Sequence, residues 1–301
     1  MGLTPDFNFE PAPDLPGSDR ASRYGFAAIR KMLDRLWDVE VEGLENIPAE
    51  GPAVITPNHL SFCDSLFVPG ALPRRVWAVG KAEYMDSWKT RYIFPAMGMI
   101  PVDRTGGDAA KAALDTAARV LDKGLLFMIY PEGTRSRSGN LHKGRTGAAR
   151  LAARCNAPII PTGHIGTPEI QPPDSVMMKT GLPCTVRFGE PMRVEDFGDP
   201  ADPRVARVFT DAVMYEISKL SGQAYVDTYA GKTEVASAPS SPSTPTVAGP
   251  TGPSRPTAPS VSVPAGRPTR PSVPPGRLAA AERIDLKATN GSTTSASAQI
   301  S

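Results

Sequence analysis

Apolar and polar positions divide residues 20–221 into short apolar runs and longer amphipathic stretches. The runs are short and mostly rich in β-branched residues, as buried strands are, and they fall at 39–41, 53–56, 76–79, 99–102, 125–130, 158–162 and 184–188. The amphipathic stretches have the length and spacing of helices, and they fall at 21–37, 64–71, 84–94, 108–123, 146–155 and 203–221. Strands that alternate with helices predict an α/β fold with a mixed, largely parallel sheet flanked by helices.

The two ends of the chain differ from this middle part. Residues 1–19 carry acidic residues and prolines without an apolar core, so we expect a flexible N-terminus and no signal peptide. Residues 231–301 are rich in Pro, Ser, Thr and Ala, hold 12 of the 33 prolines and lack aromatic residues, which predicts a disordered C-terminal tail. The expected organisation is an N-terminus (1–19), a basic helix (20–38), one α/β domain (39–230) and the tail (231–301).

The helix predicted at 20–38 is amphipathic and basic. Phe26, Ile29, Leu33 and Leu36 recur at helical spacing, while the basic residues occupy other faces: Arg23, Arg30, Lys31 and Arg35. Such a helix can pack on the core of the domain or lie in a membrane interface, and the pattern leaves both open. No run of about 18 apolar residues occurs, so no transmembrane span is predicted.

Charge and cysteine usage exclude several classes of function. The whole chain has a net charge of +2; the tail from residue 233 has six basic and three acidic residues, which leaves about −1 for the rest. Without a basic excess or a known nucleic-acid-binding pattern, no nucleic acid is expected as a partner. Three scattered cysteines without a CxxC spacing predict neither a disulfide framework nor a zinc site, and no metal is expected.

Polar residues follow three of the predicted strands. His59 comes after the run at 53–56, Arg104 after 99–102, and the segment 131–136 after 125–130. In parallel sheets, sites lie beyond the carboxyl ends of the strands. We therefore expect these three clusters to share one rim.

His59 and Asp64 are spaced as a base and the acid that orients it. Residues five apart do not face each other within a regular helix, but His59 just before a helix and Asp64 in its first turn can meet. That pair is the orienting half of a catalytic triad. A lone histidine after a strand can equally be a core or capping residue.

A basic segment follows Glu132. Residues 133–168 contain no Asp or Glu but six Lys or Arg residues, which favours an anionic ligand. There is no GxxxxGK[ST] or GxGxxG pattern, so neither a Walker nor a Rossmann site is indicated. A phosphorylated small molecule and a solvated surface loop both remain possible.

Four blocks in this order resemble those of the glycerolipid acyltransferases. Asn58 and His59, with Asp64, resemble their NHxxxxD motif, and residues 131–136 (PEGTRS) resemble their third block. Residues 98–104 (GMIPVDR) and 158–162 (PIIPT) are similar to the second and fourth blocks. The PEGTRS form and Ser61 look most like the 1-acyl-sn-glycerol-3-phosphate acyltransferases, although their usual long apolar N-terminal span is not found here.

The resemblance implies transfer of a fatty acyl group from acyl-CoA or acyl carrier protein to a lysophospholipid acceptor, without a cofactor. A hydroxyl is too weak an acid to ionise near neutral pH, so a positioned base must take its proton as it attacks. His59 would be that base, and Asp64 would fix its tautomer and stabilise the imidazolium.

The remaining site residues implied by the resemblance belong to the acceptor side. Arg104 and Arg135 would hold the phosphate of the acceptor, because arginine can grip phosphate through two parallel hydrogen bonds. Glu132 would accept hydrogen bonds from the glycerol or from one of these arginines, and Gly133 and Thr134 would offer an amide and a hydroxyl to the phosphate. By the resemblance alone Pro161 would belong to the wall of the acyl site, and it can equally be an ordinary proline at the end of a strand.

Several alternatives stay open. The acceptor could be another lysophospholipid or glycerol 3-phosphate, and a thioester hydrolase could use the same His-Asp pair with water. A non-catalytic lipid-binding scaffold could act through PxxP-like segments in the tail, at residues 253–256 and 268–271. We expect a protein bound peripherally to the cytoplasmic face of a membrane.

Overall fold

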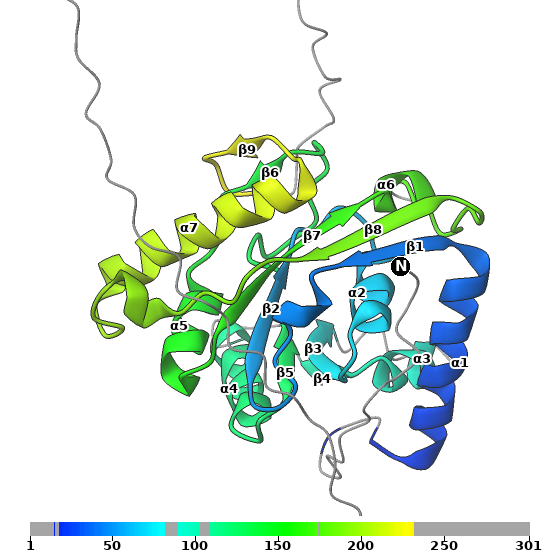
Figure 1. Ribbon diagram of the computed structural model, residues 1–301, viewed down its shortest axis with the longest axis horizontal. Helices are drawn as coiled ribbons and strands as arrows, with labels where there is room; N and C mark the ends of the chain where they lie inside the picture. Colours follow the sequence, from blue (N-terminus) through cyan, green and yellow to red (C-terminus); the bar gives the residue numbers. More distant parts are fainter. Residues whose placement is uncertain (1–14, 16–17, 82–89, 103–108, 174, 232–301) are drawn as a thin grey trace, which may run out of the picture. The chain divides into compact units, whose positions relative to one another are not determined.

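The computed structural model describes residues 15, 18–81, 90–102, 109–173 and 175–231. Within these residues one seven-stranded sheet has the order β1-β8-β7-β2-β5-β3-β4 (Figure 1). Its strands are β1 (Asp38–Glu42), β2 (Ala53–Pro57), β3 (Val76–Lys81), β4 (Met99–Val102), β5 (Leu126–Met128), β7 (Ile159–Ile165) and β8 (Pro183–Phe188). All neighbours are parallel except β7 and β8, so the expected α/β fold with a mixed, largely parallel sheet is confirmed.

Helices cover both faces of the sheet. They are α1 (Arg20–Leu36), α2 (Asp64–Ala71), α3 (Thr90–Ala96), α4 (Ala109–Leu121), α5 (Gly147–Cys155), α6 (Thr167–Ile170) and α7 (Pro203–Ser221), with 3-10 turns η1 (Leu44–Asn46) and η3 (Val194–Phe197). In Figure 1, α4, α5 and α7 lie on one side of the sheet, while α1, α2 and α3 lie on the other. Two apolar clusters follow this division, one around Phe127 and Phe209 and the other around Ile55 and Phe67.

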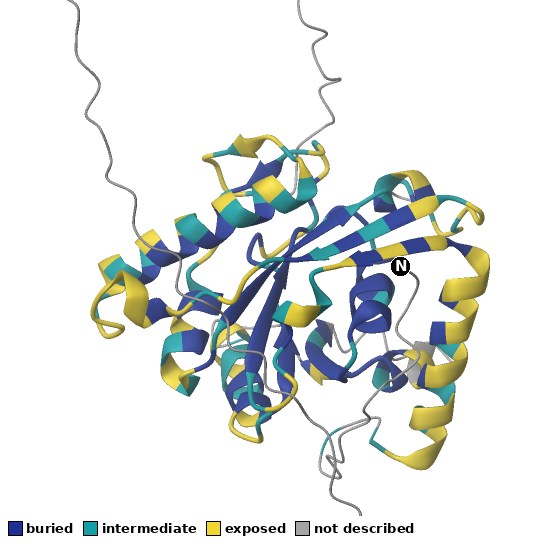
Figure 2. Cartoon of the chain, viewed as in Figure 1, coloured by how far each residue is buried: buried dark blue, intermediate teal, exposed yellow. Residues whose placement is uncertain are grey.

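Burial explains why apolar and polar residues do not alternate along the central strands. Every residue of β2 is buried, because β5 and β7 flank it and helices cover both faces, as the dark central strands of Figure 2 show. A strand covered on both faces reads as one continuous apolar run. These runs were therefore recognisable in the sequence without any period of two.

Helix α1 packs on the domain, but not with the stripe expected from the sequence. Phe26, Arg30 and Leu33 are its buried residues, whereas Leu36 is 37% exposed. Arg30 was expected on the outer face; that expectation was wrong, because Arg30 shares the i, i+4 and i+3 stripe of Phe26 and Leu33. Trp37, just past the helix, is also buried and donates from its indole nitrogen to the carbonyl oxygen of Lys179 at 2.7 Å.

A second, two-stranded sheet lies beside the main one and was not expected. Strand β6 (Leu141–His142) pairs in parallel with β9 (Tyr225–Val226), the last strand of the described residues. Strands of two residues are too short to produce a hydrophobic period. Their pairing brings the residues after α7 back to the loop that follows β5.

The helix predicted at residues 84–94 falls partly outside the described residues, which resume at 90. Tyr92 belongs to the described part and is 74% exposed, so this aromatic side chain does not pack into the core. The predicted tail, 231–301, lies outside the described residues except for Gly231. In the part of the chain that the structure describes, no helix combines the length and apolar character needed to cross a membrane.

Candidate active site

His59 lies just beyond the carboxyl end of β2, where the chain turns into α2. Its Nδ1 atom is 3.0 Å from Oδ2 of Asp64, the first residue of α2. The structure thus brings together the two residues selected from the sequence by their spacing. A carboxylate can only accept, so Nδ1 carries the proton and Nε2 presents its lone pair.

Asp64 is completely buried and is held from three sides through the same oxygen. Besides His59, the main-chain nitrogens of Leu60 and Ser61 donate to Oδ2 at 2.7 and 2.8 Å. Burial by itself raises the pKa of Asp64, but the hydrogen bond from His59 and smaller effects outweigh it, and the pKa lies below its usual range. The side chain is therefore a fixed carboxylate at neutral pH.

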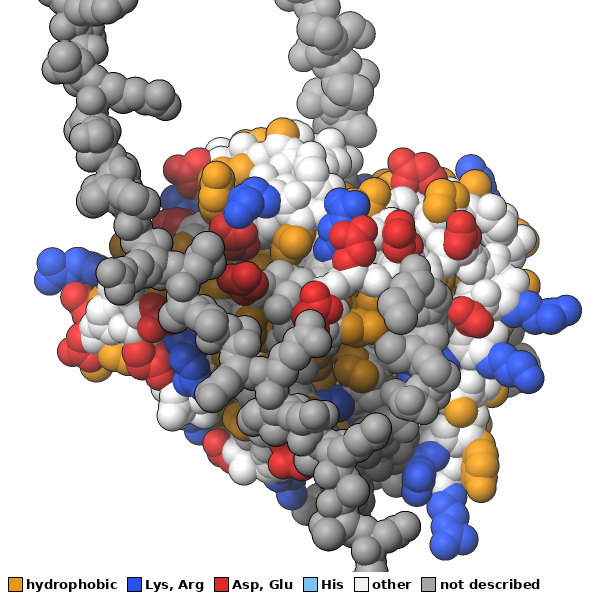
Figure 3. Space-filling view, in the orientation of Figure 1, with side chains coloured by type: hydrophobic (Ala, Val, Ile, Leu, Met, Phe, Trp, Pro, Cys, Tyr) orange, Lys and Arg blue, Asp and Glu red, His pale blue; other side chains and the backbone are white. Residues whose placement is uncertain are grey.

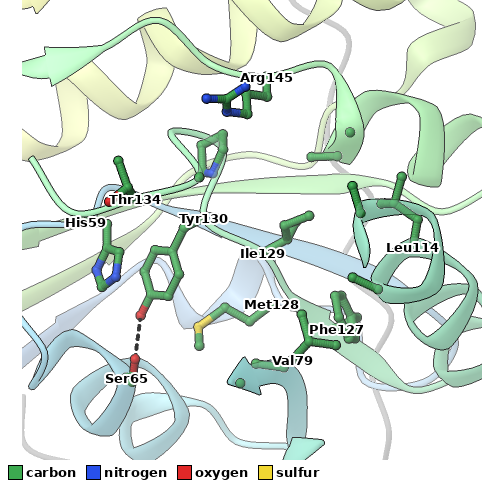
Figure 4. A pocket seen from close by; sticks show the side chains of 18 of the residues that line it. His59, Ser65, Val79, Leu114, Phe127, Met128, Ile129, Tyr130, Thr134 and Arg145 are labelled. Atoms are coloured by element: carbon green, nitrogen blue, oxygen red, sulfur yellow. Dashed lines mark hydrogen bonds between the residues drawn. The ribbon is translucent and has the colours of Figure 1, made fainter. Parts of the chain in front are cut away.

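Tyr130 fixes the plane of the imidazole. Its ring stacks on His59 with centroids 3.8 Å apart and an angle of 14°, and its hydroxyl lies 3.2 Å from Oγ of Ser65 (Figure 4). Burial raises the pKa of Tyr130 well above its usual value, so the phenol stays protonated. In the sequence Tyr130 is only the last residue of an apolar run. Its position directly before the PEGTRS segment is the one feature that could have indicated a place in the site.

Glu132 joins the PEGTRS loop to the base. It is 1% exposed; Oε1 accepts from the main-chain nitrogen of His59 at 3.1 Å, and Oε2 accepts from that of His142 at 3.0 Å. In addition, the nitrogen of Ser136 donates to the carbonyl oxygen of His59 at 2.8 Å. These contacts make Glu132 a brace for the loop, and its expected contact with the acceptor stays a prediction.

A pocket of about 810 Å³ opens beside His59, within the usual size of small-molecule sites. Gly133, Thr134 and Arg135 line it, and their expected contact with the acceptor phosphate stays a prediction. The far side is apolar: Figure 4 shows Leu114 of α4 across the pocket from His59, with Val79, Phe127 and Ile129 between them. Three alanines of α4 complete this wall: Ala109, Ala110 and Ala113.

Arg145 and Arg150 also line the pocket, and neither was selected from the sequence as a site residue. The guanidinium of Arg145 lies over the ring of Tyr229, 5.3 Å from its centre, in the segment that follows β9. A side chain at Gly133 would meet Arg145 at 2.9 Å, and the φ angle of Gly133 is +77°, so glycine is required there. The only sequence signal for Arg145 was the lack of acids around it.

Two predicted site residues do not join this group. Arg104 lies outside the described residues. Pro161 does not line this pocket: it is buried inside β7, opposite Thr56, and its carbonyl oxygen accepts from Gly189 at 2.8 Å. The expected place of Pro161 in the wall of the acyl site therefore stays a prediction.

The nearby sulfur and hydroxyl groups are not arranged as nucleophiles. Burial raises the pKa of Cys63 to about 12, so its thiol does not ionise near neutral pH. The hydroxyl of Ser61 is buried and donates to the carbonyl oxygen of Gln171 at 2.8 Å. Among the described residues, no group of three or more His, Cys, Asp or Glu side chains could hold a metal ion.

A partly exposed histidine, held by a buried aspartate at a pocket with one apolar wall and an arginine rim, is suited to acyl transfer. Residues 38–165 match the family model described as Acyltransferase. A computed match to the crystal structure of the 1-acyl-sn-glycerophosphate (LPA) acyltransferase PlsC from Thermotoga maritima supports the fold. It has a TM-score of 0.53 and 23% identity and covers 67% of this chain and 81% of that one.

Two proteins named as 1-acyl-sn-glycerol-3-phosphate acyltransferases are similar to part of this chain. The chain is 30% identical over 140 residues to the chloroplastic 1-acyl-sn-glycerol-3-phosphate acyltransferase LPAT1 of Arabidopsis thaliana, covering 46% of this chain and 39% of that protein. It is 32% identical over 124 residues to the human 1-acyl-sn-glycerol-3-phosphate acyltransferase alpha, covering 41% and 44%. The match thus spans about two-fifths of each relative. The resemblance to the glycerolipid acyltransferases that the motifs indicated is confirmed.

Proposed function

We propose that this chain transfers a fatty acyl group from acyl-CoA or acyl carrier protein to the free hydroxyl of 1-acyl-sn-glycerol 3-phosphate, giving phosphatidate in phospholipid biosynthesis. The observation that carries the proposal is the position of the His59–Asp64 pair, 3.0 Å apart, at a pocket with one apolar wall and an arginine rim. The names of the relatives support the choice of acceptor.

His59 would act as the general base. Its Nε2 atom has no hydrogen-bond partner among the described residues, and it would take the proton of the acceptor hydroxyl as that oxygen attacks the thioester carbonyl. The carbon–sulfur bond then breaks, and the imidazolium returns the proton to the leaving sulfur. Asp64 stabilises the imidazolium between these steps, and Tyr130 presents a ring face to it.

The two sides of the pocket suit the two ends of the reactants. The acyl chain would lie against the apolar wall of Val79, Leu114 and Ile129, where burial of each methylene contributes about 0.8 kcal/mol. Arg104 and Arg135 would hold the acceptor phosphate, with Gly133 and Thr134 beside it. Arg145 adds a further cation at the rim, and no acidic side chain pairs with it among the described residues.

The test is an acceptor panel. Purified protein is incubated with a labelled acyl-CoA and, in parallel, with the same acyl group on acyl carrier protein. The acceptors are 1-acyl-sn-glycerol 3-phosphate, another lysophospholipid and glycerol 3-phosphate. Labelled phosphatidate from the first acceptor is expected. Release of free fatty acid at the same rate without any acceptor would identify a hydrolase and contradict the proposal.

We further propose that α1 attaches the protein peripherally to the cytoplasmic face of a membrane. Lys and Arg side chains gather with apolar ones along the right edge of Figure 3, over α1. Tyr24 is 77% and Met32 40% exposed there, next to exposed Arg20, Lys31 and Arg35.

Sedimentation with anionic phosphatidylglycerol vesicles tests this attachment. The amount of protein that sediments should be smaller in a Tyr24→Ser, Met32→Ser double variant. It should be unchanged in Tyr215→Ser, which alters an exposed tyrosine of α7. Equal binding by both variants would contradict this proposal.

The PxxP-like segments of the tail suggest a partner that binds extended proline-rich chain. Both segments lie outside the described residues. A variant ending at Gly231 should keep acyl transfer and lose only the binding of such a partner, because all described residues of the pocket are retained. Loss of acyl transfer in that variant would show that the tail serves the reaction.

A further inference from the structure

Behind Asp64 lie several buried polar atoms for which the described part of the chain offers no hydrogen-bond partner. They are Oδ1 of Asp64, the hydroxyl of Thr167 and both ring nitrogens of His164. Asp64 and Thr167 are completely buried, and His164 is 1% exposed. Most buried polar atoms in proteins have a partner, so a cluster of such atoms next to the predicted base requires an explanation.

The three side chains face one another from three elements. His164 lies four residues after Ile160 in β7, so the two side chains point to the same face of the sheet. Ile160 packs in the apolar cluster that includes residues of α2, so this is the face that α2 covers. Thr167 begins α6, and its carbonyl oxygen lies 3.7 Å from the sulfur of Cys63, the residue before Asp64. The Thr167 hydroxyl is close enough to the carboxyl group of Asp64 to help lower its pKa.

The main chain of His164 is tied to the strand end that carries the base. Oδ1 of Asn58, the residue before His59, accepts from the nitrogen of His164 at 2.7 Å, and Nδ2 of Asn58 donates to the carbonyl oxygen of His164 at 3.2 Å. Gly166, with a φ angle of +91°, then turns the chain from β7 into α6 and so sets the position of Thr167. Asp64, His164 and Thr167 are thus held in one rigid corner of the domain.

The two oxygens of Asp64 are engaged very differently. Oδ2 is bound to His59 and two main-chain nitrogens, while Oδ1 is buried and has no hydrogen-bond partner among the described residues. Burial lowers the pKa of His164, and the opposing effect of Asp64 is smaller, so the imidazole is neutral near pH 7. A neutral imidazole and a hydroxyl can donate to Oδ1 without drawing the negative charge of Asp64 away from His59.

We propose that His164 and Thr167 are positioning residues that hold Oδ1 of Asp64 by hydrogen bonds, directly or through one buried water. They keep the carboxylate plane fixed, so that Oδ2 stays on Nδ1 of His59 while the imidazolium forms. The kinetic part of this inference rests on the proposed function; the part that concerns the proton on Nδ1 does not.

The first experiment compares variants of Thr167. Thr167→Val removes the hydroxyl at nearly the same shape, Thr167→Ser keeps it, and Thr210→Val is the matched control. Thr210 is a buried threonine of α7 whose hydroxyl donates to the carbonyl oxygen of Ala206. In Thr167→Val we expect kcat to fall about tenfold, the effect of one hydrogen bond, with both KM values nearly unchanged. Thr167→Ser should restore most of kcat.

The second readout needs no activity. The chain has three histidines, so the proton on Nδ1 of His59 can be assigned in the proton NMR spectrum as the resonance lost in His59→Gln. It should shift or broaden in Thr167→Val and in His164→Leu, and it should be unchanged in Thr167→Ser and Thr210→Val. Failure of acyl transfer in the unaltered protein would remove the proposed function and leave this result to decide the positioning role.

Two outcomes would overturn the inference. One is a Thr167→Val protein whose kcat and Nδ1 proton match those of Thr210→Val. The other is an equal loss of kcat in Thr167→Val and Thr167→Ser, because the shape of the side chain and not its hydroxyl would then matter. His164→Leu can fold poorly, since it alters a fully buried site, but the two Thr167 variants decide without it.

Discussion

The base side and the arginine side of the pocket are held in different ways. Asp64 and Glu132 are buried, and their oxygens accept hydrogen bonds from the main-chain nitrogens of His59 and of the two residues that follow it. Arg145, by contrast, is exposed and rests on Tyr229 through a ring contact. A proton transfer requires a base in one orientation, whereas attraction between phosphate and a cation tolerates small movements. Changes on the base side should therefore lower kcat, and changes on the arginine side should raise KM.

The strongest test of this division is His59→Ala. Loss of a general base costs about 10²- to 10⁴-fold, so kcat should fall by that factor or more while the acyl donor still binds. Steady-state rates and calorimetric titration with a non-transferable acyl-CoA analogue would measure the two effects. Full turnover by the purified variant would remove His59 from the mechanism.

Arg135→Ala should act on the other side of the comparison. Loss of a charged hydrogen bond of about 1.5 to 3 kcal/mol corresponds to roughly a 10- to 100-fold rise in the acceptor KM, with kcat changed much less. We expect the same of Arg104→Ala. Arg154→Ala is the matched control, because Arg154 pairs with Asp115 and is not among the residues that line the pocket. A fall in kcat alone in Arg135→Ala would contradict the division.

Glu132→Gln tests whether Glu132 holds the loop by its hydrogen bonds to main-chain nitrogens or binds the acceptor. An amide nitrogen would face one of the two main-chain donors, which should lower the free energy of unfolding by about 1 to 3 kcal/mol and also reduce kcat. Urea unfolding and steady-state rates check this, with Glu40→Gln on the exposed face of β1 as control. If the acceptor KM rose and stability did not change, Glu132 would bind the acceptor as the family resemblance implied.

The smallest expected effect is a pH dependence of stability from the base side. The folded-state pKa of His164 lies below its usual 6.5 because of burial, so the unfolded chain binds more protons just below that pH. The contribution of His164 to stability is therefore complete above pH 6.5 and is lost as the pH falls through the folded-state pKa. Urea unfolding at pH 7 and pH 5 should show a smaller difference in His164→Leu than in the unaltered protein. An equal difference would contradict this.

Much of the fold could be predicted from the sequence, because its signals are local. Helix α2 was expected at residues 64–71 and occurs there, since its position depends on the strand before it and on Asp64 at its start. The reversed direction of β8 relative to β7 had no local signal. The face of α1 was misjudged because Arg30 is charged, although its long apolar stem lets it occupy a buried position.

The site was predictable only where its residues are close in sequence. His59 and Asp64 are five apart, so their contact could be anticipated from helix geometry. Tyr130, Arg145 and Tyr229 come to the pocket from the loops after β5 and β6 and from the chain after β9, and no spacing rule connects them. Their roles follow from tertiary packing.

Because β9 pairs with β6, residues near the site are contributed by a segment that is synthesised late. His59 is made in the first quarter of the chain, but Gln223, which donates to the carbonyl oxygen of Gly139 and accepts from Asn58 beside the base, is made much later, as is Tyr229. A nascent chain that ends at Ser221 contains every strand of the main sheet and still lacks these two residues. We therefore expect a prematurely terminated product to form the main sheet but to lack part of the pocket. Only a chain translated past β9 would have the complete pocket.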